Sequence, residues 1–260
     1  MKNILKSIFL LAIFTTISLG TNASEQSQKL LNPEWSFKGF FGKFDRASLQ
    51  RGYQVYTEVC SACHSIKYLN YRNLAESGGP EFSEEEAKAI ASQYEVIDGP
   101  NSDGEMFTRP ARLSDNFVGS FANEEEAKAA NGGSYPPDMS VLVKARKGDA
   151  NYIYSLLLGY DDPPSDFTLD EGVYYNTFMS GNKIKMAKPL SEDLVEYSDG
   201  TLATEEQMAK DVTTFLAWAA EPHLEARHKL GFRTVTYLII ITILVYFSMK
   251  KVWSRIETEV

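Results

Sequence analysis

The sequence predicts an all-α fold, with one helical domain that has long loops and a single transmembrane helix near its C-terminus. Three observations support this prediction. Leu49, Tyr53 and Tyr56 recur at spacings of four and three residues, which is one face of an α-helix. Residues 208–219 repeat the pattern, and residues 234–249 form a stretch of sixteen residues without a charge. Extended over about 20 residues, such a stretch can cross a bilayer.

The first 23 residues are typical of a secretory signal peptide. Lys2 and Lys6 precede the apolar run 8–19, and small residues lie at 21–23 before Ser24. A transit peptide would be rich in Arg, and this segment has none. The segment therefore predicts export to a bacterial periplasm, with the mature domain spanning residues 24–229.

The first helix of the domain is expected to begin after Asp45, whose side chain is a good N-cap. Its apolar face continues to Cys60. Gly52 lies in its interior, where Gly costs about 1 kcal/mol relative to Ala. We therefore predict a close helix–helix contact at Gly52.

The helix leads into the motif Cys60-Ser61-Ala62-Cys63-His64, which contains both cysteines of the chain. This is the attachment pattern of a c-type haem. Each thiol bonds one vinyl group of the haem, and the adjacent histidine can bind the iron. A redox Cys pair or half of a zinc site are the alternatives, but the chain shows no βαβ pattern and its other histidines lie far away. We expect one covalently bound haem c and a cytochrome c-type haem domain.

Further helix starts follow along the chain. Residues 83–89 and 123–129 each place acidic residues behind a capping residue. Another helix is expected over 152–158, ending at Gly159, and the last domain helix from Thr204. Segments 98–115 and 161–189 have few regular signals and are expected to be loops, of which the second is unusually long.

The C-terminal apolar stretch predicts a membrane anchor over residues 230–250. Lys250, Lys251 and Arg255 follow it. By the positive-inside rule, the tail 251–260 should lie in the cytoplasm and the haem domain on the opposite side. The predicted location is thus a bacterial inner membrane, crossed once.

The exported part of the chain is strongly acidic. Residues 24–230 contain 20 Lys and Arg against 33 Asp and Glu, a net charge of 20 − 33 = −13, although the whole chain has only −9. This charge argues against nucleic acid as a partner and favours a basic protein.

A haem that only carries electrons needs a second axial ligand, and a methionine would raise its potential. His223 and His228 lie next to the anchor and are weak candidates. Met179 and Met186 lie in the long loop before the last domain helix, where the chain can fold back over the haem. The pattern of residues does not separate these two methionines.

The residues around these motifs resemble the cytochrome c1 family, the membrane-anchored haem subunits of quinol–cytochrome c reductases. The resemblance covers essentially the whole mature chain. It rests on residues 51–56, 67–72, 98–101, 109–110, 131–138 and 209–222.

The resemblance implies roles for individual residues. Met186 matches the axial methionine, which makes His64 and Met186 the two iron ligands. Arg146 and Tyr152 match residues that hold a haem propionate, and Arg109 is a weaker candidate for the same role. Asn131, Pro136 and Pro137 match haem-pocket residues, and a carbonyl of the proline pair is expected to accept the Nδ1–H of His64.

The resemblance also implies a function. The chain would carry single electrons from the Rieske iron–sulfur protein to a basic cytochrome c, within a dimeric membrane complex that contains cytochrome b. It would not catalyse a reaction by itself. An anchored monohaem carrier of another periplasmic electron-transfer complex is the alternative, and a haem sensor or peroxidase with an open sixth site is a third possibility.

Overall fold

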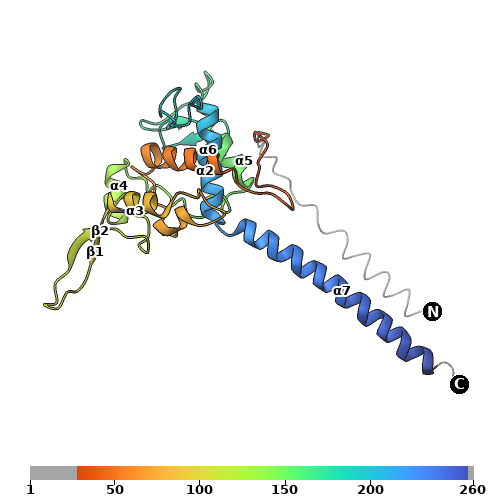
Figure 1. The fold of residues 1–260 in the computed structure, drawn as a ribbon. Helices are drawn as coiled ribbons and strands as arrows, with labels where there is room; N and C mark the ends of the chain where they lie inside the picture. The colour runs from red at the N-terminus through yellow and green to blue at the C-terminus, as the bar shows by residue number, and fades with distance from the viewer. Residues whose placement is uncertain (1–27, 257–260) are drawn as a thin grey trace, which may run out of the picture.

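The computed structural model describes residues 28–256, so the predicted signal peptide and the end of the tail lie outside the described part. A mostly helical domain forms one body, and one long helix leaves it (Figure 1). This confirms the predicted fold class. The helical elements are α2 (Arg46–Val55), η1 (Tyr56–Cys60), η2 (Tyr71–Ala75), α3 (Glu84–Ser92), α4 (Glu124–Ala130), α5 (Asp149–Leu158), η3 (Ser180–Asn182), α6 (Glu205–Ala220) and α7 (Leu224–Ile256).

The core forms where α2 crosses α6, as Figure 1 shows. Gly52 lies at the crossing, and a Cβ built on it would lie 2.1 Å from the carbonyl oxygen of Asp211 and 2.8 Å from the Cβ of Phe215. Only glycine allows the two backbones to approach this closely, which confirms the predicted contact. Tyr56 stacks on Phe215, with ring centroids 5.7 Å apart.

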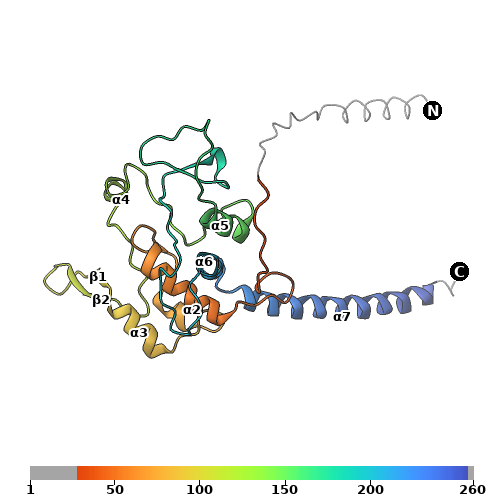
Figure 2. The ribbon, with the colours of Figure 1, turned by 90° about the horizontal axis from the view of Figure 1, so that it is seen from above.

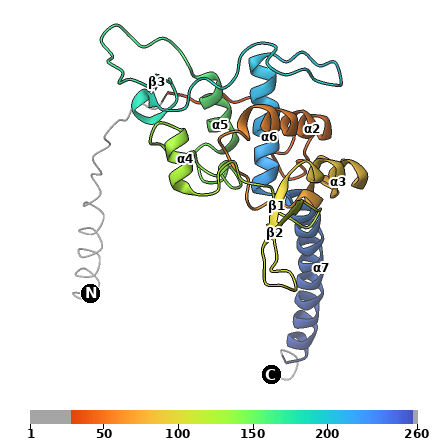
Figure 3. The same ribbon diagram turned by 90° about the vertical axis from the view of Figure 1, so that its left-hand side faces the viewer.

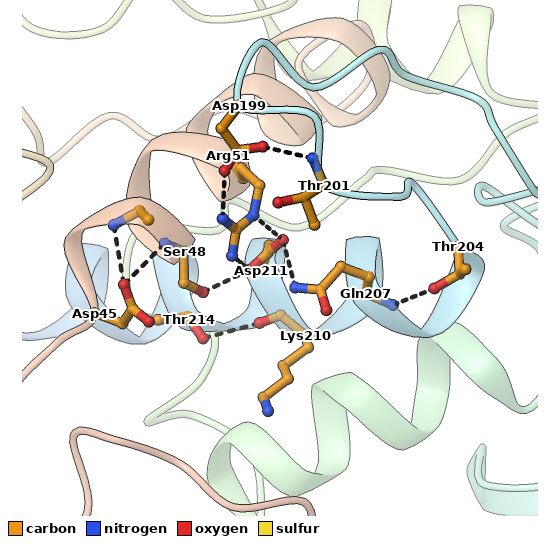
Figure 4. Close-up of polar contacts among 11 residues, drawn as sticks. Asp45, Ser48, Arg51, Asp199, Thr201, Thr204, Gln207, Lys210, Asp211 and Thr214 are labelled. Carbon is orange, nitrogen blue, oxygen red and sulfur yellow. Dashed lines mark hydrogen bonds and ion pairs between the residues drawn. The ribbon is translucent and has the colours of Figure 1, made fainter.

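A buried ion pair fixes the register of this crossing (Figure 4). Asp211 of α6 has only 1% of its side chain exposed and accepts from Nε of Arg51 at 2.8 Å. Ser48 and Gln207 donate to the same carboxylate at 2.7 and 2.9 Å. Arg51 also binds Asp199 at 2.7 Å, in the loop before α6. A buried carboxylate with this many donors is electrostatically satisfied.

The helix boundaries confirm the predicted caps. Asp45 accepts from the amides of Ala47 and Ser48 at the start of α2. Ser83 and Asn123 cap α3 and α4, and Thr204 caps α6. Helix α5 starts three residues earlier than predicted, at Asp149, and ends before Gly159 as expected.

The segment 98–115 is not only a loop, which corrects the prediction. Strands β1 (Glu95–Asp98) and β2 (Phe107–Pro110) pair antiparallel, with Val96 opposite Arg109, and form a hairpin that projects from the domain (Figure 1). The short strands carried too little alternation to be seen in the sequence. A second short pair, β3 (Tyr174–Tyr175) and β4 (Lys183–Ile184), interrupts the long loop.

Helix α7 is separated from α6 by a break at Glu221–His223, where Pro222 ends the helical hydrogen bonding. It then runs away from the domain (Figures 2 and 3). Leu224–Ser254 is long and apolar enough to cross a membrane, and its apolar stretch is not buried by the protein. The segment predicted to be the anchor is therefore part of one continuous helix and is a candidate membrane span.

Candidate haem site

The Cys60–His64 motif is held in a tight turn at the end of α2. The five residues Tyr56–Cys60, which end at the first cysteine of the motif, form a π-helix. Ser61 N donates to Tyr56 O at 2.8 Å. Cys63 N and His64 N then both donate to Cys60 O, at 3.1 and 2.9 Å. The π turn redirects the chain so that both thiols and the imidazole lie within one turn, a common use of such turns at functional sites.

The imidazole of His64 is oriented by a single backbone contact. Its Nδ1 lies 2.8 Å from the carbonyl oxygen of Pro137. A carbonyl only accepts, so Nδ1 donates and Nε2 carries the free lone pair. Burial lowers the pKa of His64, which keeps the ring neutral. The predicted hydrogen bond from His64 to a carbonyl of the proline pair is thus present, with Pro137 as the acceptor. It leaves the ring in the tautomer that an iron ligand needs, while the haem-pocket role of Pro136 and Pro137 stays a prediction.

The surroundings of Cys60 favour uncharged sulfur. Burial, together with the neighbouring Cys63, raises the pKa of Cys60 to about 12. A thioether carries no charge, so this environment suits the product of haem attachment better than a thiolate metal ligand. Within residues 28–256, groups of three or more His, Cys, Asp and Glu that could hold a metal ion do not occur. The residues present therefore fit a covalently bound haem.

The segment after α4 borders the motif. Asn131 caps the end of α4, where its side-chain amide donates to Ala127 O at 2.8 Å. Pro136 lines a shallow hollow together with Cys63, Phe121 and Tyr135. The structure thus brings Pro136 and Pro137 to the motif. The side chain of Asn131 instead binds the C-terminal end of α4.

The two residues expected at a haem propionate lie at the start of α5. Arg146 is exposed, and its Nη1 donates to the carbonyl of Ala145 at 3.3 Å. Tyr152 is half-buried, and its hydroxyl lies 3.5 Å from Sδ of Met179. Tyr152 and Met179 are therefore neighbours. The propionate role of Arg146 and Tyr152 stays a prediction.

Met186 follows β4, on the loop that returns from the long segment. The hydroxyl of Tyr160 donates to Met186 O at 3.0 Å. Asn176, which is fully buried, donates to Leu156 O and accepts from the amides of Phe178 and Met179. Tyr160 and Asn176 could not be predicted from the sequence, because a polar residue in an irregular segment carries no periodic signal.

Arg109 lies on β2 and its guanidinium is engaged by protein carboxylates. It forms ion pairs with Asp98 and Asp115, the second at 2.6 Å. These pairs close the base of the β1–β2 hairpin. They give Arg109 a structural role that the sequence did not indicate, and its role at a propionate stays a prediction.

Comparison with known proteins agrees with this geometry. The sequence model described as "Cytochrome C1 family" matches residues 35–256, which include the whole site. The chain belongs to the cytochrome c1 family. Membership implies a haem c cofactor, which the site residues fit.

Several curated cytochromes c1 are similar over nearly the whole chain. "Cytochrome c1" of Rhodospirillum rubrum is 43% identical, covering 90% of this chain and 91% of that protein. "Cytochrome c1 1, heme protein, mitochondrial" of Arabidopsis thaliana is 45% identical, covering 95% and 79%. "Cytochrome b/c1" of Bradyrhizobium diazoefficiens is 47% identical over 94% of this chain but only 38% of its own length. The last protein is thus much longer than this chain.

Proposed function

We propose that the chain is the one-electron carrier subunit of a respiratory quinol–cytochrome c reductase. It accepts electrons from the Rieske iron–sulfur protein and passes them to a basic cytochrome c. The observation that carries this proposal is the bond from His64 Nδ1 to Pro137 O. It holds the ring of a Cys-x-x-Cys-His turn in the tautomer and orientation of an iron ligand, in a member of the cytochrome c1 family.

Haem c, when bound, supplies a single-electron couple at its iron. Cys60 and Cys63 would hold it covalently, and His64 would provide one axial nitrogen. Met186 is the proposed second ligand, held on its loop by Tyr160.

The remaining residues would position the cofactor rather than react. Pro136, Pro137 and Asn131 belong to the segment that borders the motif. Arg146 and Tyr152 would bind a propionate, since a guanidinium compensates the charge of a carboxylate and a hydroxyl donates a hydrogen bond to it. In this role the chain transfers electrons and uses neither acid–base nor nucleophilic chemistry, so it would not catalyse a reaction by itself.

The same proposal sets the location and the partners. Helix α7 anchors the chain, the haem domain lies in the bacterial periplasm, and residues 251–260 lie in the cytoplasm. Cytochrome b and the Rieske protein are its partners in a dimeric complex. The charge of −13 on residues 24–230 would attract a basic cytochrome c.

Purification of the affinity-tagged full chain from its membranes tests the proposal. We expect cytochrome b and the Rieske protein to co-purify, and quinol to reduce the haem of this chain. Co-purification with a terminal oxidase, without reduction by quinol, would support the alternative of an anchored carrier in another complex.

A further inference from the structure

Three aromatic side chains form an exposed cluster where the domain meets α7. Phe40, Phe41 and Phe232, called here the aromatic collar, are 62%, 74% and 51% exposed. Their ring centroids lie 4.9 Å apart for Phe40 and Phe41, and 6.5 and 6.1 Å from each of these to Phe232. The loop that carries Phe40 and Phe41 lies against the first turns of α7 in Figure 2.

The same segment buries its other aromatic residues. Trp35, Phe37 and Phe44 are at most 8% exposed and belong to the core. Phe37 packs against both Trp35 and Phe44, with ring centroids 5.4 and 5.1 Å away. The outward position of Phe40 and Phe41 is therefore a feature of a well-packed segment and not of a loose one.

Hydrogen bonds hold the loop in place. Gly42 N donates to Gly39 O at 3.2 Å, which closes the turn that carries the two rings. His228 of α7 lies with Nδ1 3.2 Å from Gly42 O. Two residues beyond the turn, Phe44 N donates to Glu225 at 3.1 Å.

The base of α7 is fixed to the domain as well. Glu225, only 7% exposed, binds both terminal nitrogens of Arg46, at 2.8 and 3.0 Å. Arg46 also pairs with Glu81 at 3.0 Å. The loop, the first turn of α7 and the domain thus move together, so the position of the collar relative to the helix is fixed.

The collar lies at the level where α7 would enter the hydrocarbon. Phe232 stands two residues before Thr234, where the uncharged stretch begins. Exposed cations lie at the same level: Lys229 and Arg233 on the helix and Lys43 on the loop. Aromatic rings are favoured at this boundary, and cations there meet lipid phosphates. An exposed aromatic patch of this kind, continuous with a candidate membrane span, matches the bilayer interface.

We propose that Phe40 and Phe41 insert into the lipid interface beside α7, as a second membrane contact of the chain. Two contacts joined by a rigid junction fix both the height and the tilt of the haem domain above the bilayer, which a single helix would leave free. The inference rests on the proposed membrane crossing of α7, but names a site and a ligand class beyond it.

Spin labels on the haem-loaded full chain in phosphatidylcholine and phosphatidylglycerol vesicles test the proposal. The chain's only two cysteines are in the haem motif, so Phe41→Cys adds the one free thiol. Leu202→Cys, at a position 76% exposed on the domain, is the aqueous control, and Leu244→Cys in α7 is the membrane control. The measurement is the accessibility of each nitroxide to oxygen relative to a water-soluble nickel chelate.

We expect the oxygen-to-nickel ratio at position 41 to be several-fold higher than at position 202 and below that at position 244. A ratio at position 41 equal to that at position 202, with position 244 in lipid, would overturn the insertion of the collar into lipid. It would leave the membrane crossing of α7 intact. Exposure of position 244 to nickel would instead overturn the membrane crossing of α7.

A second measurement decides between lipid and protein in native membranes. Phe41→p-benzoylphenylalanine keeps an aromatic ring and forms a covalent adduct with its neighbour on illumination. We expect lipid adducts at position 41. A protein adduct of defined mass would overturn the proposal, because the collar would then be a contact with another subunit.

Discussion

The contact from His64 Nδ1 to Pro137 O joins two segments 73 residues apart. The motif provides the ligand, but the ring is free to rotate until the second segment is in place. Because the carbonyl accepts a hydrogen bond from Nδ1–H, it determines that Nε2 is the nitrogen left for iron. A backbone acceptor suits this task, since substitution of the Pro137 side chain leaves the carbonyl in the chain.

The identity of the second ligand can be tested at residue scale. We expect Met186→Leu to abolish the low-spin, methionine-ligated form in the reduced-minus-oxidised spectrum and to lower the reduction potential, because a thioether ligand raises it. Met179→Leu is the matched control, since Met179 contacts Tyr152. Loss of the low-spin form in the control and not in Met186→Leu would exchange the two assignments.

Asp199 allows a prediction about pH. The amide of Thr201 and the guanidinium of Arg51 lower its pKa from 3.8 to about 2. Since the folded pKa is the lower one, its stabilising effect is complete above the unfolded value and is lost as the pH falls through about 2. Asp199→Asn should therefore lower the free energy of unfolding slightly at pH 7, because the group is exposed.

The same substitution should make the fall in stability between pH 4 and pH 2 shallower. Denaturant unfolding of the haem-loaded chain across this range measures both effects. Parallel stability curves for Asp199→Asn and the parent would contradict the predicted contribution of this carboxylate.

At the scale of elements, the α2–α6 crossing positions the motif. Helix α2 leads directly into the π turn that carries Cys60, so a shift of α2 against α6 displaces the motif relative to the 136–137 carbonyls. The Asp211–Arg51 pair and the close approach at Gly52 oppose such a shift. The site is therefore sensitive to packing outside it.

Gly52→Ala tests this sensitivity. A Cβ 2.1 Å from Asp211 O forces the helices apart, and overpacking of this kind costs about 1–3 kcal/mol. We expect a loss of this size in the free energy of unfolding. Gly231→Ala in α7 is the matched control, because a Cβ there meets nothing within 4 Å, and helix propensity favours Ala. Equal effects of the two substitutions would contradict the role of the crossing.

At the scale of the whole molecule, charge and anchoring act together. In the proposed function, the acidic domain would attract a basic carrier, and α7 would keep the haem domain near its electron donor. Attraction between exposed charges is screened by salt. The rate of electron transfer from the reduced chain to a basic cytochrome c should therefore fall as ionic strength rises, as measured by stopped-flow absorbance. An acidic cytochrome c is the control and should show no fall. An electron-transfer rate to the basic cytochrome c that does not change with ionic strength would contradict electrostatic docking.

The sequence by itself determined the features that depend on neighbours in the chain. The haem motif, the helix caps at Asp45, Ser83 and Thr204, and the apolar length of α7 are all local patterns. Gly52 was a partial exception, because a glycine inside a helix signals a close contact without naming the partner.

Only the tertiary structure decided the contacts between distant segments. These contacts are the acceptance of the His64 hydrogen bond by Pro137, the burial of Asp211 and Glu225 against Arg51 and Arg46, and the hydrogen bond from Tyr160 to the carbonyl of Met186. The β1–β2 hairpin was missed because its strands are four residues long and its closing charges lie outside a periodic pattern. Hydrogen bonds and ion pairs between distant residues leave no periodic pattern in the sequence. Their partners can therefore be identified only once the chain is folded.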